Sequence, residues 1–495
     1  MTGPGAPQAL SGGRSGPAAL RPLLDEALAG LDAGARLRGG PIAPGGPGET
    51  TRQVRQVLDD PAPDSTALRR LTELLAYGAA DPADPACAAH LHCPPLAVAV
   101  AADLAVSALN PSQDSWDQAP AATALETELL AELAALVGFP PAAAAGVLTS
   151  GGTESNLMGL MLARDRVLGG AVELDGLPAG RRPRILASAA AHFSVQRAAA
   201  LLGLGERAVL TVPVDRDQRM DADALAAARA GAVRAGETPV AVVATAGTTD
   251  TGAIDPLHRC ADLARRYGAR LHVDAAYGGG ALFSGRLAPL LDGIARADSV
   301  SLDFHKLGWQ PAAAGVFLVR HRESYASLAR RAAYLNPADD EQAGYPSLLG
   351  YSLRTTRRPD AFKLAVTLRT LGRAGLGALV DACHDLARHA AAAVRAEPAL
   401  EGQGEPVLTT VLLRYRPADP DPAAADLVNA ELRRQLLRTG TAVVGRTEIP
   451  GDGPGRVRLK LTLLNPHTTP ADVDRLLAEI VRHGREVEFR YSAHP

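Results

Sequence analysis

The sequence predicts an α/β protein with a mostly parallel sheet, and three observations support this fold class. Helical stretches alternate with short apolar runs between about residues 96 and 320, as in parallel strands connected by helices. The chain has 495 residues, 47% of them hydrophobic, which suffices for one large core and smaller appendages. Beyond residue 371, helices and strands follow each other as in a small α+β domain. We therefore expect a flexible tail (1–50), a helical arm (51–95), a large domain (96–371) and a small C-terminal domain (372–495).

The N-terminal segments differ in composition. Residues 1–50 are rich in Gly, Pro and Ala, and only residues 20–31 show helical spacing, so we expect a mobile tail. Between residues 51 and 78 apolar residues recur at helical intervals, which predicts the arm. Pro61 and Pro63 are expected to divide it into two helices.

Short apolar runs mark the candidate strands of both domains. In the large domain they cover residues 184–188, 208–212, 240–246, 270–273, 299–302 and 315–320. The small domain is expected to contain helices at 376–394 and 423–440 and strands at 406–415 and 456–464. Residues 334–351 interrupt the pattern and are a candidate mobile loop. Ligands of parallel sheets bind beyond the C-terminal strand ends, so polar residues there are the candidate site.

Composition excludes several classes of function. The net charge is −3 and no long basic run is present, so a nucleic-acid partner is not expected and a small molecule is. Four cysteines without a CxxC pair indicate reduced thiols and a cytoplasmic protein. We expect neither export nor membrane insertion, because the sequence shows neither a signal-peptide pattern nor a long uncharged apolar stretch.

Asp274 and Lys306 lie at the ends of two successive predicted strands. A lysine beyond one strand and an acid at the tip of the preceding one are how a pyridoxal 5'-phosphate (PLP) site is built. The amine forms a Schiff base, and the carboxylate holds the pyridine nitrogen protonated. A single lysine is most often solvated, but His305 and the flanking apolar residues indicate a partly buried amine.

Small residues between the apolar segment 146–148 and the helical run 157–167 predict a phosphate cup. Gly151, Gly152 and Thr153 would let backbone N–H groups approach an anion at the positive end of a helix dipole. An ordinary helix cap with a glycine-rich turn would use the same residues. His192 follows another strand and could stack on a pyridine ring, or serve only the structure. Thr249 could bind a cofactor oxygen, or belong to a polar turn.

These features, in this order at successive strand ends, resemble the group II PLP-dependent amino acid decarboxylases, a family of fold type I. The resemblance covers roughly residues 82–469. It looks closest to the L-2,4-diaminobutyrate decarboxylase-like branch, whose signatures are similar to segments 90–95, 110–118, 303–306 and 355–363. The aromatic branch carries Asn-Pro-His-Lys where this chain has Asp303, Phe304, His305 and Lys306. The resemblance implies a PLP-dependent transferase fold with a seven-stranded type of sheet, and a homodimer with active sites at the interface.

The resemblance also implies roles for individual residues. Lys306 would form the Schiff base, Asp274 would bind the pyridine nitrogen and His192 would stack on the ring. The remaining cofactor residues would be Gly151, Gly152, Thr153, Thr249, Ala276, Asp303 and His305. Tyr345 on the loop would protonate the substrate carbon, with Tyr334 and Tyr351 as alternatives. His90, His92 and Trp116 would line the substrate pocket. We expect no metal at His90, His92 and Cys93, because a fourth ligand is not visible and two prolines follow.

The expected reaction is decarboxylation of an L-amino acid, with L-2,4-diaminobutyrate giving 1,3-diaminopropane as the first choice. Asp114 and Asp117 could bind its distal ammonium, although both could equally be solvated or capping residues. The segment 308–315 departs from the branch and would suit an apolar or aromatic substrate, so lysine, ornithine, glutamate, valine, tyrosine and tryptophan remain alternatives. A fold-type-I aminotransferase would use an arginine clamp, for which Arg446, Arg456 and Arg458 are available. A non-catalytic PLP-binding protein would be expected to lack the lysine.

Overall fold

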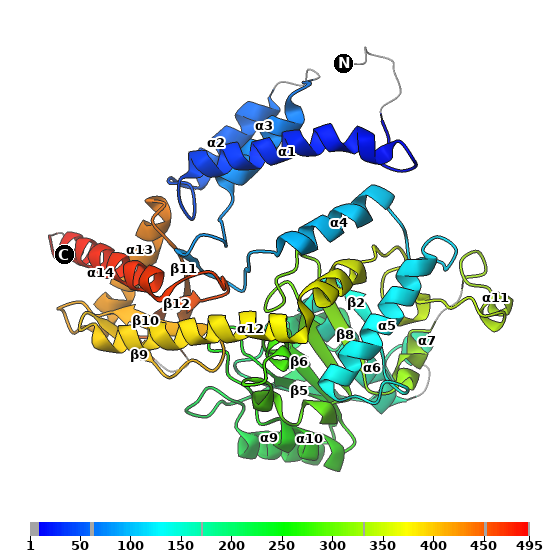
Figure 1. Ribbon diagram of the computed structural model, residues 1–495. Helices are drawn as coiled ribbons and strands as arrows, with labels where there is room; N and C mark the ends of the chain where they lie inside the picture. The colour runs from blue at the N-terminus through cyan, green and yellow to red at the C-terminus, as the bar shows by residue number, and fades with distance from the viewer. Residues whose placement is uncertain (1–8, 60–63, 170–171, 330–331, 450–452, 494–495) are drawn as a thin grey trace.

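The computed structural model describes residues 9–59, 64–169, 172–329, 332–449 and 453–493. Three groups of elements are visible in Figure 1: the N-terminal helices α1 to α3, a large sheet covered by helices, and a small sheet at the C-terminal end of the chain. The large sheet with its helices carries the candidate site.

The N-terminal group is helical from Gly16 onward. It consists of α1 (Gly16–Arg38), α2 (Pro47–Leu58) and α3 (Ala67–Gly78), with α1 packed along α3. A Cβ atom on Gly34 would lie 2.3 Å from the carbonyl oxygen of Glu73, so glycine is what permits this close packing. The expected flexible tail is therefore wrong for residues 16–38, while residues 1–8 and the expected helix breakers Pro61 and Pro63 lie outside the described residues.

The large sheet has seven strands in the order β2-β8-β7-β6-β5-β3-β4. β8 is antiparallel to both of its neighbours, and all other neighbouring pairs are parallel. This confirms the predicted fold class. All six predicted strands are present, and their bounds, with the additional β2, are β2 (Ala145–Thr149), β3 (Pro183–Ser188), β4 (Val209–Val212), β5 (Thr238–Thr245), β6 (Arg270–Ala275), β7 (Ser299–Asp303) and β8 (Gly315–Val319).

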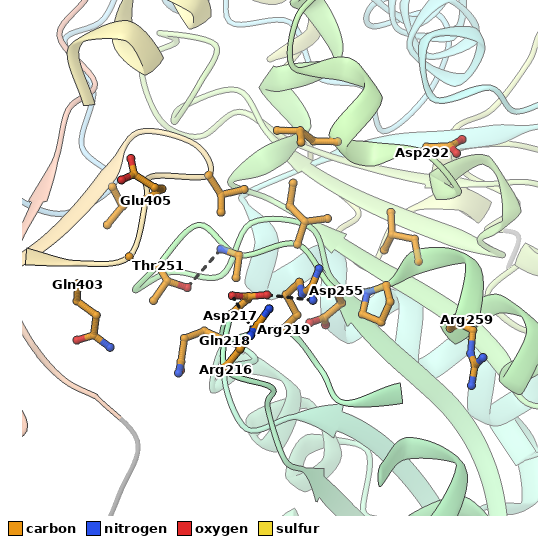
Figure 2. A pocket seen from close by; sticks show the side chains of 18 of the residues that line it. Arg216, Asp217, Gln218, Arg219, Thr251, Asp255, Arg259, Asp292, Gln403 and Glu405 are labelled. Atoms are coloured by element: carbon orange, nitrogen blue, oxygen red, sulfur yellow. Dashed lines mark hydrogen bonds and ion pairs between the residues drawn. The ribbon is translucent and has the colours of Figure 1, made fainter. Parts of the chain in front are cut away.

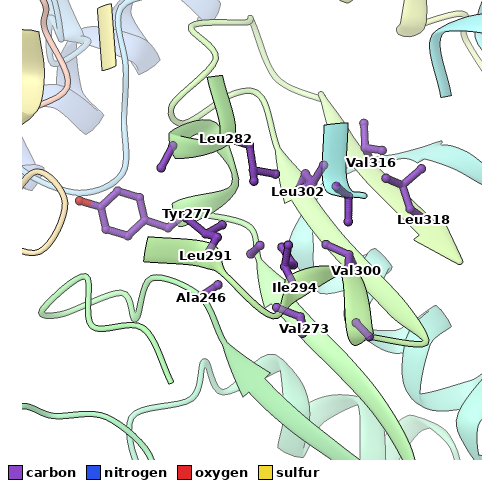
Figure 3. Close-up of a cluster of buried hydrophobic side chains, with 14 of the residues drawn as sticks. Ala246, Val273, Tyr277, Leu282, Leu291, Ile294, Val300, Leu302, Val316 and Leu318 are labelled. Carbon is purple, nitrogen blue, oxygen red and sulfur yellow. The ribbon is translucent and has the colours of Figure 1, made fainter. Parts of the chain in front are cut away.

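The central strands are buried on both faces, which explains their continuous apolar sequences. One face of the sheet contributes Val273, Val300 and Leu302 to the largest core cluster, where they pack with short 3-10 helices (Figure 3). The other face packs on α6 and α8 through a second cluster. The helices around the sheet are α4 (Ala97–Leu109), α5 (Pro120–Val137), α6 (Gly152–Leu168), α7 (Val172–Asp175), α8 (Ser194–Leu201), α9 (Ala222–Arg234) and α10 (Leu257–Arg266).

The small domain is a five-stranded sheet in the order β1-β11-β12-β10-β9. Its strands are β1 (Cys87–Ala88), β9 (Leu400–Gln403), β10 (Thr410–Tyr415), β11 (Val443–Glu448) and β12 (Val457–Thr462), and α13 (Pro422–Arg438) and α14 (Pro470–Ala493) accompany them. β9 and β11 were not predicted. The edge strand β1 comes from the N-terminal arm and pairs in parallel with β11. The arm is thus joined to the small domain.

A long helix, α12 (Ala361–Ala396), connects the two domains (Figure 1). Its regular geometry is interrupted at Gly372, whose φ is 65° and ψ is 176°. The predicted domain boundary falls at this residue. The expected loop at 334–351 contains only the short helices α11 (Ala338–Gln342) and η6 (Leu349–Tyr351). Among the described residues, every helix is too short or too polar to cross a lipid bilayer.

Candidate active site

A cavity of about 380 Å³ lies at the C-terminal ends of the parallel strands. Fifteen residues line it, and they include every residue that the sequence predicted to surround a cofactor: Gly151, Gly152, Thr153, His192, Thr249, Asp274, Ala276, Asp303, His305 and Lys306. These residues come from five different strand ends. The strand order therefore brings together side chains that are far apart in the sequence.

Lys306 reaches the cavity from the turn that follows β7. Its Nζ lies 3.0 Å from Asp303 Oδ2, and the Asp303 side chain is only 2% exposed. His305 Nε2 lies 3.5 Å from the same oxygen. Burial lowers the pKa of His305 although Asp303 opposes this, so the imidazole is neutral at neutral pH. Asp303 Oδ1 and His305 Nδ1 are buried without a hydrogen-bond partner among the described residues.

Asp274 lies in β6, one residue before its end, and faces the same cavity. Its Oδ1 accepts hydrogen bonds from the backbone N–H of Ala276 (3.1 Å) and from Ser301 Oγ (3.3 Å). Its Oδ2 accepts one from Asn156 Nδ2 (2.7 Å). Donors converge on a buried carboxylate, as an ionised acid requires. Such a group can bind a protonated ring nitrogen.

The predicted phosphate cup is the turn between β2 and α6. A Cβ atom on Gly151 would lie 3.2 Å from His305 Cε1, and one on Gly152 would lie 3.0 Å from the Cβ of Ala276. Side chains here would fill the cavity, so glycine keeps the backbone accessible to a ligand. α6 has 17 residues, and its N-terminus carries the positive end of the helix dipole toward this turn.

The residues of the cavity fit PLP. A lysine amine suits an aldehyde, and the glycine turn at a helix N-terminus suits a phosphate. A carboxylate held by several donors suits a pyridinium nitrogen. The two unpartnered buried atoms, Asp303 Oδ1 and His305 Nδ1, indicate that the cavity is built for a polar ligand.

His192 and Thr249 complete the wall of the cavity. Burial lowers the pKa of His192, and the nearby carboxylate of Asp274 opposes this shift only in part. The imidazole Nδ1 is 2.9 Å from Ser194 Oγ. The carbonyl oxygen of Thr249 accepts a hydrogen bond from Lys460 Nζ (3.2 Å) on β12, so the small domain holds this loop in place.

The residues predicted to contact the substrate lie elsewhere in the single chain. His90 and His92 are exposed, and the Trp116 ring packs against that of Tyr345 with a centroid distance of 5.1 Å. None of these four side chains lines the described cavity. Asp114 accepts a hydrogen bond from Thr356 Oγ1 (3.1 Å), and Asp117 from Ser115 Oγ (2.5 Å), so each carboxylate has a hydrogen-bond partner in its own chain. Their roles toward a substrate stay predictions.

The segment 308–315 does not line the cavity either. The Trp309 side chain is buried, and its Nε1 donates to the carbonyl oxygen of Leu464 (2.8 Å). Trp309 therefore contacts the small domain, whereas Gly315 packs behind the glycine turn, where a Cβ atom would lie 2.6 Å from Gly151 Cα.

Sequence reasoning missed five lining residues: Ser150, Asn156, Thr245, Gly247 and Tyr277. Asn156 is the most informative of them, because it donates directly to Asp274. The available signal was its position about one helical turn beyond Gly152. A polar residue there falls on the face of α6 that covers the strand ends.

A second and larger cleft, of about 770 Å³, separates the large domain from the turn between β9 and β10 (Figure 2). It offers no lysine amine. Its buried acid, Asp255, accepts hydrogen bonds from the backbone N–H groups of Thr245 and Met220, both at 2.7 Å, so the carboxylate already serves the structure. Arg219 is paired with Asp215 at 2.8 Å. We therefore assign the chemistry to the cavity around Lys306. Within the described ranges, three or more potential metal ligands do not cluster anywhere.

Known proteins resemble this chain in sequence and fold. Residues 47–416 match the family described as "Pyridoxal-dependent decarboxylase conserved domain". The chain is 47% identical to an L-2,4-diaminobutyrate decarboxylase from Rhizobium meliloti, covering 82% of this chain and 79% of the relative. It is 38% identical to an L-2,4-diaminobutyrate decarboxylase from Acinetobacter baumannii, covering 85% and 84%. A crystal structure from Vibrio parahaemolyticus superposes with a TM-score of 0.86 at 34% identity, covering 96% of this chain and 98% of the other. That structure is the glutamate decarboxylase domain of diaminobutyrate-pyruvate transaminase and L-2,4-diaminobutyrate decarboxylase.

Proposed function

Because the chain belongs to the pyridoxal-dependent decarboxylase family, we propose that it converts L-2,4-diaminobutyrate to 1,3-diaminopropane and CO2. The family membership makes the protein a PLP-dependent carboxy-lyase that acts on an amino acid. The observation that carries the choice of substrate is the similarity to two L-2,4-diaminobutyrate decarboxylases over most of both chains. The Asp-Phe-His-Lys sequence at 303–306 supports the same choice.

The proposed roles follow from the positions of the side chains. When bound, PLP supplies a sink for the electron pair that departing CO2 leaves at the substrate Cα. Lys306 provides the amine that anchors the cofactor, and Asp303 holds this amine from 3.0 Å away. The Asp274 carboxylate binds the proton on the ring nitrogen, while Gly151, Gly152 and the N-terminus of α6 bind the phosphate. His192 would face the ring from the turn that follows β3.

We further propose that the hydroxyl of Tyr345 delivers the proton to Cα. Its side chain is 48% exposed, on a surface loop that carries only short helices, and it lies outside the cavity of its own chain. A mobile loop could close over a site and exclude water during the reaction. In Tyr345→Phe we expect CO2 to be released while the fraction of amine among the products falls, because protonation becomes slow. Chromatographic product analysis checks this, and an unchanged ratio would move the role to Tyr334, Tyr351 or His192.

The protein is proposed to be a cytoplasmic homodimer with active sites at the interface. The four cysteines are free thiols, as a reducing compartment favours. Apolar side chains of the N-terminal helices stay exposed in the single chain, as expected of a surface that a second copy covers; they include Leu23, Leu28, Leu37, Leu58 and Leu75. Analytical ultracentrifugation tests the dimer, and fractionation of cells tests the location.

Mixed dimers test whether the sites are shared. We would combine Lys306→Ala subunits, which lack the anchoring amine, with Tyr345→Phe subunits. If the tyrosine acts in the partner's site, the only active site of a mixed dimer contains an intact lysine and an intact tyrosine. The ratio of products should then return to that of the wild type. A ratio like that of Tyr345→Phe alone would place the tyrosine in its own subunit's site.

Steady-state kinetics test the substrate. The PLP-loaded protein would be assayed for CO2 release with L-2,4-diaminobutyrate, ornithine, lysine, glutamate, valine, tyrosine and tryptophan. We expect kcat/KM to be highest for L-2,4-diaminobutyrate. A higher kcat/KM for valine or tyrosine would refute the cationic substrate and leave the decarboxylase class intact.

A further inference from the structure

A single amide side chain, that of Asn156, connects two groups that face the cofactor cavity, Asp274 on β6 and His192 after β3. Its Nδ2 donates to Asp274 Oδ2 at 2.7 Å and to Ser194 Oγ at 2.9 Å. Ser194 Oγ in turn lies 2.9 Å from His192 Nδ1. Asn156 is 1% exposed and Ser194 is fully buried, so water does not compete for these contacts. One side chain therefore links Asp274 to His192.

The orientation of the amide is fixed by its partners. An ionised carboxylate only accepts hydrogen bonds, so the NH2 group of Asn156 must face Asp274. The amide oxygen then faces His272 Nε2 (2.9 Å), which must donate, and Ser301 Oγ (3.1 Å), whose single hydrogen is shared between this oxygen and Asp274 Oδ1. Burial lowers the pKa of His272 to about 4, so its ring is neutral and carries a single proton, on Nε2. Its Nδ1 accordingly accepts from Ser299 Oγ (2.9 Å), which completes a consistent set of donors and acceptors.

The same set of bonds determines which nitrogen of His192 is protonated. Ser194 Oγ accepts from Asn156, which leaves its own hydrogen for His192 Nδ1. The backbone N–H of Ser194 also points at Nδ1, at 3.3 Å. Because two donors converge on Nδ1, a neutral His192 must carry its proton on Nε2. It therefore offers a donor, suited to an anionic group such as a substrate carboxylate.

We propose that Asn156 is a positioning residue that holds the Asp274 carboxylate in place and, through Ser194, keeps His192 in its Nε2–H form. This inference rests on the roles proposed above for Asp274 and His192. The new element is that a single amide, that of Asn156, orients both of these side chains. A carboxamide at this position accomplishes this because it can donate twice and accept twice.

The inference predicts how His192 responds to pH. The charged groups facing its ring are Asp274, Asp303 and Lys306 at the strand ends and Arg197 on α8, which begins two residues after His192. Without the Asn156 amide, Ser194 Oγ no longer has to accept from it and becomes free to accept from a protonated Nδ1. The imidazolium is then better tolerated, so the pKa of His192 should rise. Ser194→Ala, which removes a hydroxyl donor to Nδ1, should shift this pKa in the same direction.

The first experiment follows His192 by NMR in the PLP-free protein with 13C-labelled histidine, using His192→Asn to assign the signal. We expect the His192 titration to move to higher pH in Asn156→Ala and in Ser194→Ala. Asn429→Ala provides a matched control, because Asn429 is also fully buried but lies in the small domain, where it bonds the backbone of Tyr415. This control should leave the titration unchanged. An unchanged titration in Asn156→Ala and Ser194→Ala overturns the inference for His192.

The second experiment separates the contact of Asn156 with Asp274 from its link through Ser194 to His192. It measures PLP affinity by absorbance on reconstitution. Asn156→Ala removes a charge-assisted hydrogen bond to Asp274, so we expect the affinity to fall roughly ten- to a hundred-fold. Ser194→Ala keeps the bond between Asn156 and Asp274. It should change the PLP affinity by less than about threefold, because only hydrogen bonds between neutral groups are lost. Equal losses in both variants, or an equal loss in Asn429→Ala, would show a general packing effect and refute the proposal. If Asn156→Ala does not fold, Ser194→Ala still tests the effect on His192.

These measurements do not depend on the substrate. A wild-type protein that binds PLP but does not act on L-2,4-diaminobutyrate would contradict the proposed substrate and leave both experiments valid. A wild-type protein with the expected activity, but with no change in either variant, would contradict only the role of Asn156.

Discussion

The buried ion pair between Glu126 and Arg357 provides the sharpest test of what stabilises the fold around the site. Glu126 lies on α5, and its Oε1 accepts from Arg357 Nη1 at 2.7 Å and from the backbone N–H of Leu148 at 3.2 Å. The two charged side chains are 0% and 1% exposed. Leu148 belongs to β2, just before the glycine turn. The pair thus fixes the strand that positions the phosphate cup.

Glu126→Gln should strongly destabilise the protein. The substitution keeps the size of the side chain but leaves the Arg357 guanidinium buried without a counter-charge, which costs about 3–5 kcal/mol. Glu132→Gln is the matched control, since Glu132 is also on α5 and pairs with Arg369 of α12. The side chains of that pair are 48% and 70% exposed, so its loss should cost at most about 1 kcal/mol.

Urea denaturation of the PLP-free proteins, followed by circular dichroism at one fixed concentration, measures the difference in the free energy of unfolding. Urea is preferred to guanidinium because it leaves ion pairs unscreened. We expect the Glu126→Gln midpoint to fall well below those of the wild type and of Glu132→Gln. If both variants lose the same small amount, burial does not determine the strength of the pair and the reasoning is wrong.

Three further changes test the site and its surroundings. In Lys306→Ala, borohydride should no longer attach PLP covalently; peptide mapping that finds the cofactor on another lysine in the wild type would contradict the assignment. Asp303→Asn should weaken PLP binding by roughly ten-fold or more in a titration, because the carboxylate that holds the Lys306 amine at 3.0 Å is lost and a hydrogen bond to a charged group contributes about 1.5–3 kcal/mol; unchanged or tighter binding would show that the carboxylate is not needed. Burial raises the pKa of Asp255 to about 6, so its contribution to stability is complete below pH 4 and is lost as the pH rises through about 6. Asp255→Asn should remove this pH dependence, worth about 3 kcal/mol, from urea midpoints measured between pH 4 and 7.

The large domain could be predicted because its strands and its site leave local signals. Strands buried on both faces are continuous apolar runs, and Asp274 and Lys306 lie near the C-terminal ends of two of them. Ligand-binding residues of a parallel sheet gather at one edge, so chain order was enough to place them together. The small domain gave weaker signals, because strands such as β11 are buried over only half of their length.

Other features depend on contacts that a sequence pattern does not contain. The glycines that suggested a flexible N-terminal tail are the ones that let α1 approach α3, as Gly34 shows. Asn156 was missed because a single amide within a helix belongs to no sequence pattern. Its role follows only from its contacts with Asp274 and Ser194. Similarity to a family suggested His90 and Trp116 as pocket residues, but in one chain they lie away from Lys306. Their role toward a substrate depends on the proposed homodimer.

The pairing of β1 with β11 has a consequence for how the chain is made. Cys87 and Ala88 cover the outer edge of Val443 and Val444, so the small sheet is closed by residues from opposite ends of the polypeptide. During synthesis on the ribosome, β1 can pair with β11 only after almost the whole chain has emerged. A chain that lacks residues 1–88 would leave β11 as an unpaired edge strand. Unpaired edge strands are sites at which proteins aggregate.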